Sequence, residues 1–263
     1  MNHSSIKISN YENGIVRVTL NRPEKHNAFD DELIAQLTST LHELDQDDSV
    51  RVLILDAAGK SFSAGADLNW MKKMSEYSLD ENRQDSQYLA DLMASLYGMQ
   101  CITIASVQGA TYGGGVGLVA CCDMAVASVN ASFCFSEVKL GLIPAVISPY
   151  VIQAIGERAA KRYFSTAERF DSKRAAELGL VSEMVREDEL EARVMSLAEL
   201  IIENGPEAVI QAKQLIKDVA NQPVDKHLRT MTANRIATIR ATRQGKEGVN
   251  AFLEKRKANW EKK

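Results

Sequence analysis

Two glycine-rich turns contain the residues of this chain that could do chemistry through the backbone. The first turn covers residues 61–68 and follows an apolar run at 50–56, and the second covers 109–115 and follows an apolar run at 101–107. Small residues let a ligand approach peptide N–H groups closely, and N–H groups at the start of a helix favour negative charge. Two such groups that converge on one carbonyl oxygen would form an oxyanion hole. The pair of turns indicates an enzyme that acts beside a polarised carbonyl group.

Neither turn matches a nucleotide-binding motif. The second turn has three consecutive glycines at 113–115, but it lacks the G-x-G-x-x-G pattern with its following acid, and no Gly-Lys-Ser/Thr ends it. Each turn taken alone also fits a structural role. The first could be a capped helix after a strand, and the second could serve tight packing of a helix on a strand.

Glu137 is the side chain whose position best suits general acid–base catalysis. It follows an apolar extended stretch at 131–135 and precedes a segment with Gly141 and Pro144. A carboxylate that is partly removed from water has a raised pKa, which suits proton transfer. A surface ion pair with Lys139 is the competing interpretation. The histidines and cysteines lack metal-ligand spacing and no G-x-S-x-G elbow is present, so the sequence supports neither a metal site nor a serine hydrolase.

Apolar periodicity predicts the elements that must hold the turns and Glu137 in place. Residues 6–11 and 14–21 alternate apolar and polar side chains around Asn13-Gly14, which predicts a β-hairpin. Continuous apolar runs predict buried strands, and apolar residues at helical spacing predict helices. The expected strands cover 50–56, 101–107, 123–127 and 131–135, and the expected helices cover 30–44, 68–74, 88–99 and 115–122. The polar stretch 75–85 is expected to be a mobile surface loop.

Helices dominate the rest of the predicted structure. They are expected at 147–155, 157–164, 172–178, 187–204, 206–220, 224–242 and 246–257, with a return strand at 179–181. Strands separated by helices and then followed by helices alone indicate an α/β core with a helical C-terminal region. We place the boundary so that 1–200 form the core and 201–263 form the helical region.

The composition indicates a globular protein of ordinary type. The chain has 263 residues, of which 45% are hydrophobic and 25% are charged, and its formal net charge is −4. This slight acidity argues against non-specific binding of nucleic acid. No secretory signal begins the chain and no run of about 18 apolar residues occurs, so we expect a cytoplasmic protein that does not enter a membrane.

Five segments, taken together, resemble the enoyl-CoA hydratase/isomerase (crotonase) superfamily. They lie at 20–29, 61–68, 109–117, 122–123 and 136–144, in the family's order and with its spacing. The resemblance extends over nearly the whole chain. It implies an α/β fold, a crotonase-like spiral of βαβ units with a C-terminal helical trimerisation region, assembled as a homotrimer or a dimer of trimers. It also implies an acyl-CoA thioester substrate and no prosthetic group.

The resemblance also assigns roles to residues of this chain. The N–H groups of Ala66 and Gly114 would hold the thioester oxygen and stabilise its enolate, and Glu137 would move protons. Lys25 lies where family members contact the phosphates or adenine of CoA, although His26 or Arg22 could serve instead. The residues expected to contact CoA are Lys25, Ala28, Ala64, Ala66, Asp67, Leu68, Asn69 and Gly114.

One departure from the family pattern affects the expected reaction. Hydratases of the mitochondrial type use two glutamates, and this chain has Gly117 where the second would stand. A single glutamate suits a Δ3,Δ2-enoyl-CoA isomerase, which is one alternative. A third possibility is a non-catalytic module that binds CoA esters or RNA.

A closer likeness favours hydration. Bacterial methylglutaconyl-CoA and isohexenylglutaconyl-CoA hydratases, from leucine and terpene catabolism, also lack the second glutamate. The segments that carry this likeness lie at 65–71, 121–125, 135–138, 141–149, 167–170 and 252–260. The carboxylate of such a substrate would need a cationic partner, for which Lys72, Lys73 and Lys139 are candidates. Residues 145–147 are expected to shape the acyl pocket.

Overall fold

A six-stranded sheet organises the first of two units into which the chain divides, Met1–Ser196 and Leu197–Lys263. The computed structural model describes residues 4–260. The strands lie in the order β1-β2-β3-β4-β6-β9, and the hairpin pair β1–β2 is antiparallel while all other neighbours are parallel. Their bounds are Ile6–Asn10 (β1), Ile15–Leu20 (β2), Val52–Ala57 (β3), Ile102–Val107 (β4), Met124–Ser128 (β6) and Glu183–Val185 (β9). The predicted hairpin and buried strands are confirmed.

A smaller three-stranded sheet stands beside the second glycine-rich turn. It consists of β5 (Ala110–Tyr112), β7 (Ser132–Cys134) and β8 (Phe170–Asp171), in that order. The sequence did not predict β5 or β8, because segments of two or three residues show no periodicity. Parallel pairing of β5 with β7 brings the second turn next to the stretch that leads into Glu137.

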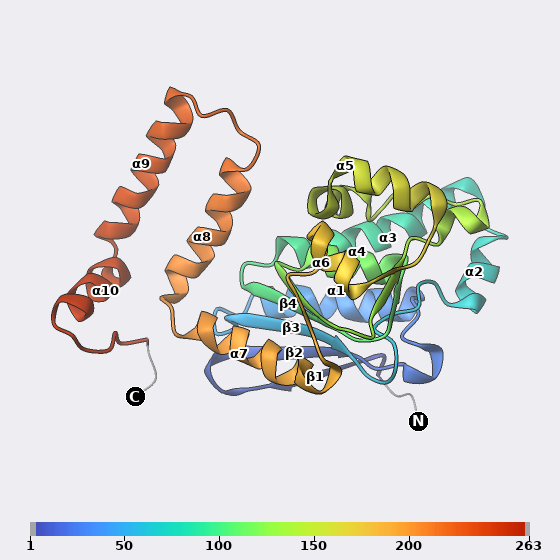
Figure 1. Cartoon of the computed structure of the whole chain (residues 1–263), viewed down its shortest axis with the longest axis horizontal. Helices are drawn as coiled ribbons and strands as arrows, with labels where there is room; N and C mark the ends of the chain where they lie inside the picture. Colours follow the sequence, from blue (N-terminus) through green and yellow to red (C-terminus); the bar gives the residue numbers. More distant parts are fainter. Residues whose placement is uncertain (1–3, 261–263) are drawn as a thin grey trace. The chain divides into compact units, whose positions relative to one another are not determined.

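Two long helices, α1 (Asp31–Asp45) and α3 (Leu79–Gly98), pack against each other and extend the core of this unit (Figure 1). Asp30 caps α1 by accepting a hydrogen bond from the N–H of Leu33. The expectation of a loop over 75–85 is wrong, because Ser78 and Glu81 form a capping box that starts α3 at Leu79. The polar side chains of the first turns of α3 face solvent, so the helix shows little apolar periodicity there.

Shorter helices complete the first unit. They are α2 (Leu68–Met74), α4 (Gly114–Cys121), α5 (Ser148–Thr166) and α6 (Ser172–Leu178). Gly156, with φ 77° and ψ 158°, interrupts α5 at the point where the sequence predicted two helices. The return strand predicted at 179–181 is displaced to β9 at Glu183–Val185. Gly179 ends α6 in the left-handed region, and Leu180 and Val181 enter the core before the strand begins.

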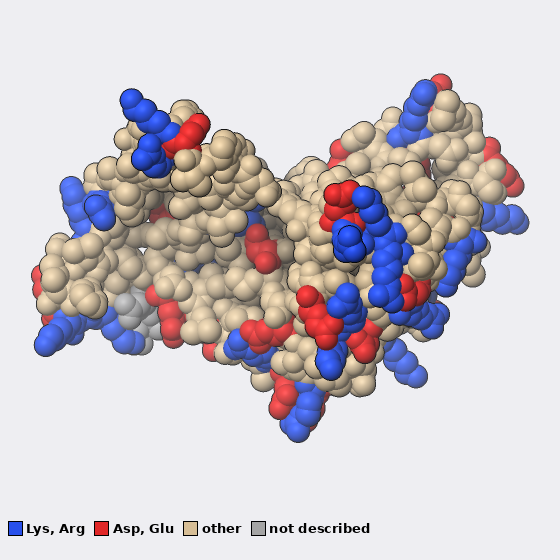
Figure 2. All heavy atoms as spheres, turned by 45° about the horizontal axis from the view of Figure 1, so that its top comes forward, with Lys and Arg blue, Asp and Glu red and all other residues tan. Residues whose placement is uncertain are grey.

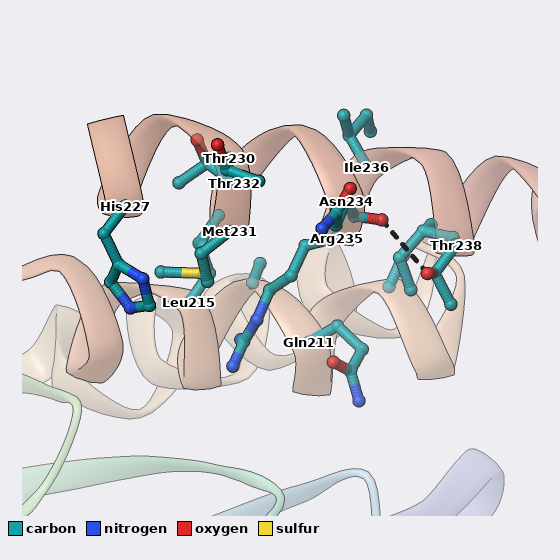
Figure 3. Close-up of a pocket in the computed structure, with 13 residues that line it drawn as sticks. Gln211, Leu215, His227, Thr230, Met231, Thr232, Asn234, Arg235, Ile236 and Thr238 are labelled. Atoms are coloured by element: carbon teal, nitrogen blue, oxygen red, sulfur yellow. Dashed lines mark hydrogen bonds between the residues drawn. The ribbon is translucent and has the colours of Figure 1, made fainter. Parts of the chain in front are cut away.

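Helices alone form the second unit, and α7 (Leu190–Ile202) runs across the division between the units. The others are α8 (Pro206–Val219), α9 (Lys226–Ala241) and α10 (Arg243–Leu253). An ion pair between Asp218 and Arg235 joins α8 to α9, which run antiparallel (Figure 1). A groove of about 630 Å³ opens along this helix pair, and Leu215 and Met231 contribute apolar surface to it (Figure 3).

Charged side chains of both signs are mixed over the surface that Figure 2 shows, where Lys and Arg stand next to Asp and Glu. Within residues 4–260, no helix combines the length and the apolar character that a membrane span requires.

Candidate active site

The backbone of Phe29 holds the first glycine-rich turn on both sides of Ala66. The Phe29 N–H donates to the Gly65 carbonyl (N···O 2.7 Å), and the Asp67 N–H donates to the Phe29 carbonyl (N···O 2.7 Å). Successive N–H groups of an extended chain point to opposite sides. The Ala66 N–H is therefore directed away from Phe29, and it has no acceptor among the described residues.

Gly113 makes the sharp change of direction that opens α4. Its φ of 50° with ψ of −120° is a conformation that glycine adopts readily and other residues do not. Its N–H donates to the Cys134 carbonyl (N···O 2.9 Å), which fixes the turn to β7. The next residue, Gly114, is the first of the helix, where N–H groups have no partner within the helix. No acceptor for the Gly114 N–H occurs in residues 4–260.

Ser63 connects the two turns directly. Its carbonyl accepts a hydrogen bond from the Tyr112 N–H (N···O 2.8 Å), and its own N–H donates to the Ala110 carbonyl (N···O 3.2 Å). Gly115 lies so close that a Cβ atom there would stand 2.9 Å from the Cβ of Ser63. The glycine run therefore has both features that the sequence left open. Gly115 allows close packing on Ser63, and Gly114 leaves an N–H group without an acceptor in residues 4–260.

Glu137 brings its carboxylate to the second turn, at the start of a short 3₁₀ turn, η3 (Glu137–Leu140). Its Oε1 lies 3.3 Å from the point where a Cβ of Gly113 would stand, and that point is 3.9 Å from the Cα of Gly65. The other carboxylate oxygen, Oε2, is buried without a hydrogen-bond partner. Burial raises the pKa of Glu137, and the hydrogen bond from its own backbone N–H opposes this shift only in part.

The surface ion pair with Lys139 that the sequence left open is absent from the described residues. Glu137 and the two turns that the sequence singled out are thus brought together in one place. An acid with a raised pKa beside free N–H groups can exchange a proton with a molecule whose carbonyl those groups polarise.

A network of charges that the sequence did not reveal holds the loop before the first turn. Arg22 is buried, and its Nη2 lies 2.5 Å from Asp30 Oδ2 and 3.6 Å from Asp67 Oδ2. Lys25 Nζ also lies 3.1 Å from Asp67 Oδ2. Burial alone would raise the pKa of Asp67, but the hydrogen bonds from Lys25 and from the N–H groups of Asn69 and Trp70 lower it.

Asp67 is the N-cap of α2, directly before the helix that the sequence predicts to begin at residue 68. The other residues expected to contact CoA surround this network. Ala28 is buried, the Ala64 N–H donates to the His26 carbonyl (N···O 3.0 Å), and Leu68 and Asn69 are exposed where α2 begins. The one signal that could have revealed this network is the burial of Arg22 in a loop. Burial cannot be read from a single sequence, so the network was missed.

Known proteins resemble this chain over nearly its full length. Residues 10–263 match the family model for enoyl-CoA hydratase/isomerase. The chain belongs to this family. A crotonyl-CoA hydratase of Syntrophomonas wolfei is 32% identical, with 92% of each chain covered. The solved structure of an enoyl-CoA hydratase of Shewanella pealeana has a TM-score of 0.93 and 42% identity, covering 97% of this chain and 96% of that one.

A solved structure from Legionella pneumophila that bears the names enoyl-CoA hydratase/isomerase and crotonase is 49% identical. Its TM-score is 0.95, and the match covers 98% of this chain and 99% of that one. These likenesses establish the crotonase fold. They also establish an enzyme of the enoyl-CoA hydratase type, a hydro-lyase.

In this enoyl-CoA hydratase family member, Ile147 fills the space beside Gly117. A Cβ atom on Gly117 would stand 2.2 Å from Cγ2 of Ile147 and 3.2 Å from Cε of Met93. Both side chains are buried, at 2% and 0% exposure. The space that a side chain at position 117 would need is thus filled by hydrocarbon, and no acid beside Glu137 comes from this position.

Proposed function

We propose that this enzyme adds water across the C2=C3 bond of a branched 2-enoyl-CoA that carries a second carboxylate, such as 3-methylglutaconyl-CoA. The observation that carries the proposal is the half-buried Glu137, which lies beside both glycine-rich turns and has one buried carboxylate oxygen without a hydrogen-bond partner. The choice of acyl group rests on the segments, among them 65–71 and 141–149, that resemble glutaconyl-CoA hydratases.

In this proposal, backbone N–H groups polarise the substrate. The thioester oxygen accepts hydrogen bonds from Ala66 and Gly114, whose N–H groups have no other acceptor in the described chain. Polarisation withdraws electrons from C3 and stabilises the enolate that forms when C3 is attacked. Removing one donor from such a site typically costs about 10²–10³ in rate.

Glu137 then handles both protons of the reaction. Its carboxylate takes a proton from water as the water oxygen bonds to C3 and the C2=C3 electron pair moves toward the thioester oxygen. The carboxylic acid so formed gives the proton to C2 as the enolate collapses. One water is consumed, and Glu137 returns to its ionised form. A raised pKa suits both halves of this cycle, because the group must accept the proton and then release it.

The CoA portion is proposed to lie along the first turn and the start of α2. Lys25 would meet a CoA phosphate while it remains paired with Asp67. Lys73 is already paired with Asp31 (Nζ···Oδ2 3.3 Å). Lys72 and Lys139 therefore become the stronger candidates for the substrate's second carboxylate, and Lys139 lies only two residues from Glu137.

Isomerisation of a 3-enoyl-CoA is the second candidate function, because position 117, which Ile147 covers, supplies no second carboxylate. One base can move a proton from C2 to C4 without the help of water. Hydration and isomerisation share the oxyanion donors and Glu137, so only the products separate them.

A panel of substrates tests the proposal. Purified protein is assayed with 3-methylglutaconyl-CoA, crotonyl-CoA and a 3-enoyl-CoA at matched concentrations. We expect the first to have the highest kcat/KM, by about tenfold or more, because one good ion pair contributes about that much. Lys139→Met should lower kcat/KM for this substrate alone. A preference for the 3-enoyl-CoA would favour isomerisation.

The second unit is proposed to assemble the enzyme into trimers or dimers of trimers. The support is the groove of about 630 Å³ along α8 and α9, in which apolar side chains such as Leu215 and Met231 lie open (Figure 3). Exposed apolar surface of this kind marks interaction sites.

A further inference from the structure

We propose that Phe29 is a positioning residue that sets the placement of the two oxyanion donors relative to each other. Phe29 has this role only if Ala66 and Gly114 act as donors in the way described above. The side chain is almost fully buried, with 2% exposure. Its backbone and its ring contact different turns, so one residue links two donors that are far apart in the sequence.

The backbone of Phe29 fixes the donor of the first turn. Its N–H and carbonyl bond the residues on either side of Ala66, at 2.7 Å each, as in a pair of parallel strands. This pairing decides the direction of the Ala66 N–H. If the backbone of Phe29 moved, the two hydrogen bonds would therefore move the Ala66 N–H with it.

The ring of Phe29 contacts the donor of the second turn. A Cβ on Gly114 would stand 3.2 Å from Cε2, 3.4 Å from Cδ2 and 3.5 Å from Cζ of the ring. The edge of the ring thus lies against the Cα of Gly114 and limits how closely the start of α4 can approach the first turn. The three atoms nearest to a Cβ on Gly114 all belong to the ring of Phe29.

Phe29 itself is anchored by both of its neighbours. The Ala28 carbonyl accepts a hydrogen bond from Arg22 Nη1 (N···O 3.2 Å). The Asp30 carboxylate pairs with Arg22 Nη2 and also caps α1 through the Leu33 N–H. A residue held on both sides can transmit its position to the groups it touches. This gives the Arg22 network a function beyond stabilising the loop.

A small displacement of either donor should reduce the rate more than it reduces binding. A misplacement of about 1 Å can cost about 10²-fold in rate, because donors must match the oxygen of the transition state and not that of the bound ester. Phe29→Leu removes the ring edge that touches Gly114 and leaves the backbone bonds in place. We expect kcat to fall about tenfold to hundredfold, with KM within about threefold of the wild type.

A matched control separates positioning from loss of packing. Phe170→Leu removes the same atoms from another buried phenylalanine, which packs on Phe133 and Tyr163. This variant should lose a similar amount of stability and keep kcat within about threefold. Equal losses of kcat in the two variants would contradict the proposal.

The glycine on the other side of the contact provides a rescue. Gly114→Ala alone adds a methyl group 3.2 Å from the ring and should lower kcat. In the double variant Phe29→Leu with Gly114→Ala, the methyl group occupies the space left by the ring. We expect kcat to recover about fivefold or more relative to Phe29→Leu. If Phe29→Leu does not fold, the test uses Gly114→Ala instead. This variant should lose kcat, and adding Phe29→Met should restore part of it.

The infrared stretching frequency of the thioester carbonyl reports polarisation without turnover. Butyryl-CoA labelled with ¹³C at the carbonyl should show a lower frequency when bound to the wild type than in water, and a smaller shift when bound to Phe29→Leu. An identical shift in both proteins would overturn the positioning role. A wild type that polarises butyryl-CoA and hydrates no enoyl-CoA would instead overturn the proposed function and leave the role of Phe29 standing.

Discussion

One carboxylate oxygen of Glu137 is buried without a hydrogen-bond partner, and burial raises the pKa of the side chain. A buried polar group with no partner costs free energy, and such groups cluster where function requires them. Within the described chain no cation pairs with Glu137 and offsets this cost. The role in proton transfer that we propose for Glu137 thus comes with a cost in stability.

The pH dependence of activity should reflect this setting. Glu137 must be ionised to accept a proton from water, so kcat/KM should rise with pH through an apparent pKa above the ordinary value of 4.5. The measurement is a profile of kcat/KM between about pH 4 and pH 9 with substrate well below KM. A profile that is flat across this range would contradict the assignment of Glu137 as the base.

The variant Glu137→Gln should lose activity but gain stability near neutral pH. A carboxyl group whose pKa is raised in the folded state stabilises the fold below the unfolded value of 4.5 and loses that contribution as pH rises through the folded value. At about pH 7 the ionised group is therefore unfavourable, and the glutamine variant should be the more stable protein.

Thermal unfolding of the two proteins at several pH values tests this expectation. The difference in Tm should be largest near neutral pH and should shrink toward about pH 4. A wild type that is more stable than Glu137→Gln at neutral pH would mean that the carboxylate has a stabilising partner.

The helix α4 begins with Gly114, the second donor that we propose, and contains Gly117, where the resemblance places the second glutamate of other hydratases. Gly117 lies one turn beyond Gly113, and its N–H bonds the Gly113 carbonyl (N···O 3.3 Å). Ile147, the N-cap of α5, covers it. The packing of α4 on α5 thus leaves no space for a side chain at position 117.

Introducing a glutamate at this position should fail unless Ile147 is removed. Gly117→Glu places a Cβ 2.2 Å from the Ile147 side chain and buries a charge, which should cost about 3 kcal/mol or more. Gly98→Glu is the matched control, because a Cβ there has no atom within 4 Å. Chemical denaturation measures the free energy of unfolding of both variants.

The double variant Gly117→Glu with Ile147→Gly should recover the part of the lost stability that the contact with Ile147 causes, while the cost of the buried charge remains. Glycine is tolerated at an N-cap, so the backbone of α5 should not suffer. If Gly117→Glu alone is as stable as Gly98→Glu, then Ile147 does not limit the site.

Helices with caps visible in the sequence were predicted closely. Asp30, Asp67 and Gly179 mark the ends of α1, α2 and α6, and the predicted bounds of these helices fall within a residue of those observed. The start of α3 was missed although its capping box is present, because the polar composition of 75–85 concealed the helix. The strands β5 and β8 exist only through pairing with β7, which no local pattern reveals.

In the candidate site, too, features with a local sequence signal were predicted and features that depend on the fold were not. Glu137 and the glycine-rich turns have local signatures and were found from the sequence. The contact of Ile147 with Gly117 and that of Phe29 with Gly114 join segments far apart in the chain. Such contacts depend on the tertiary fold, so residue types and spacing alone cannot predict them.

The second unit, considered by itself, leaves the apolar groove along α8 and α9 open. A charge placed in a desolvated apolar interface is costly, so Met231→Asp should separate the subunits of a trimer or hexamer. Analytical ultracentrifugation should give a wild-type mass that is a multiple of the 29.0 kDa chain and a smaller mass for the variant.

Ala237→Asp provides the control, because Ala237 lies on α9 but does not line the groove. This variant should keep the wild-type mass. A monomeric wild type, or an unchanged mass for Met231→Asp, would contradict assembly through this groove.

Hydration by Glu137 can be tested by following the oxygen of water into the product. The wild type and Glu137→Gln are incubated with 3-methylglutaconyl-CoA in water enriched in ¹⁸O, and the products are analysed by mass spectrometry. We expect one heavy oxygen atom at C3 with the wild type. With Glu137→Gln we expect a rate lower by about 10²-fold or more, while the variant should still bind the ester. A shifted double bond without heavy oxygen, or full activity of Glu137→Gln, would contradict hydration by this single carboxylate.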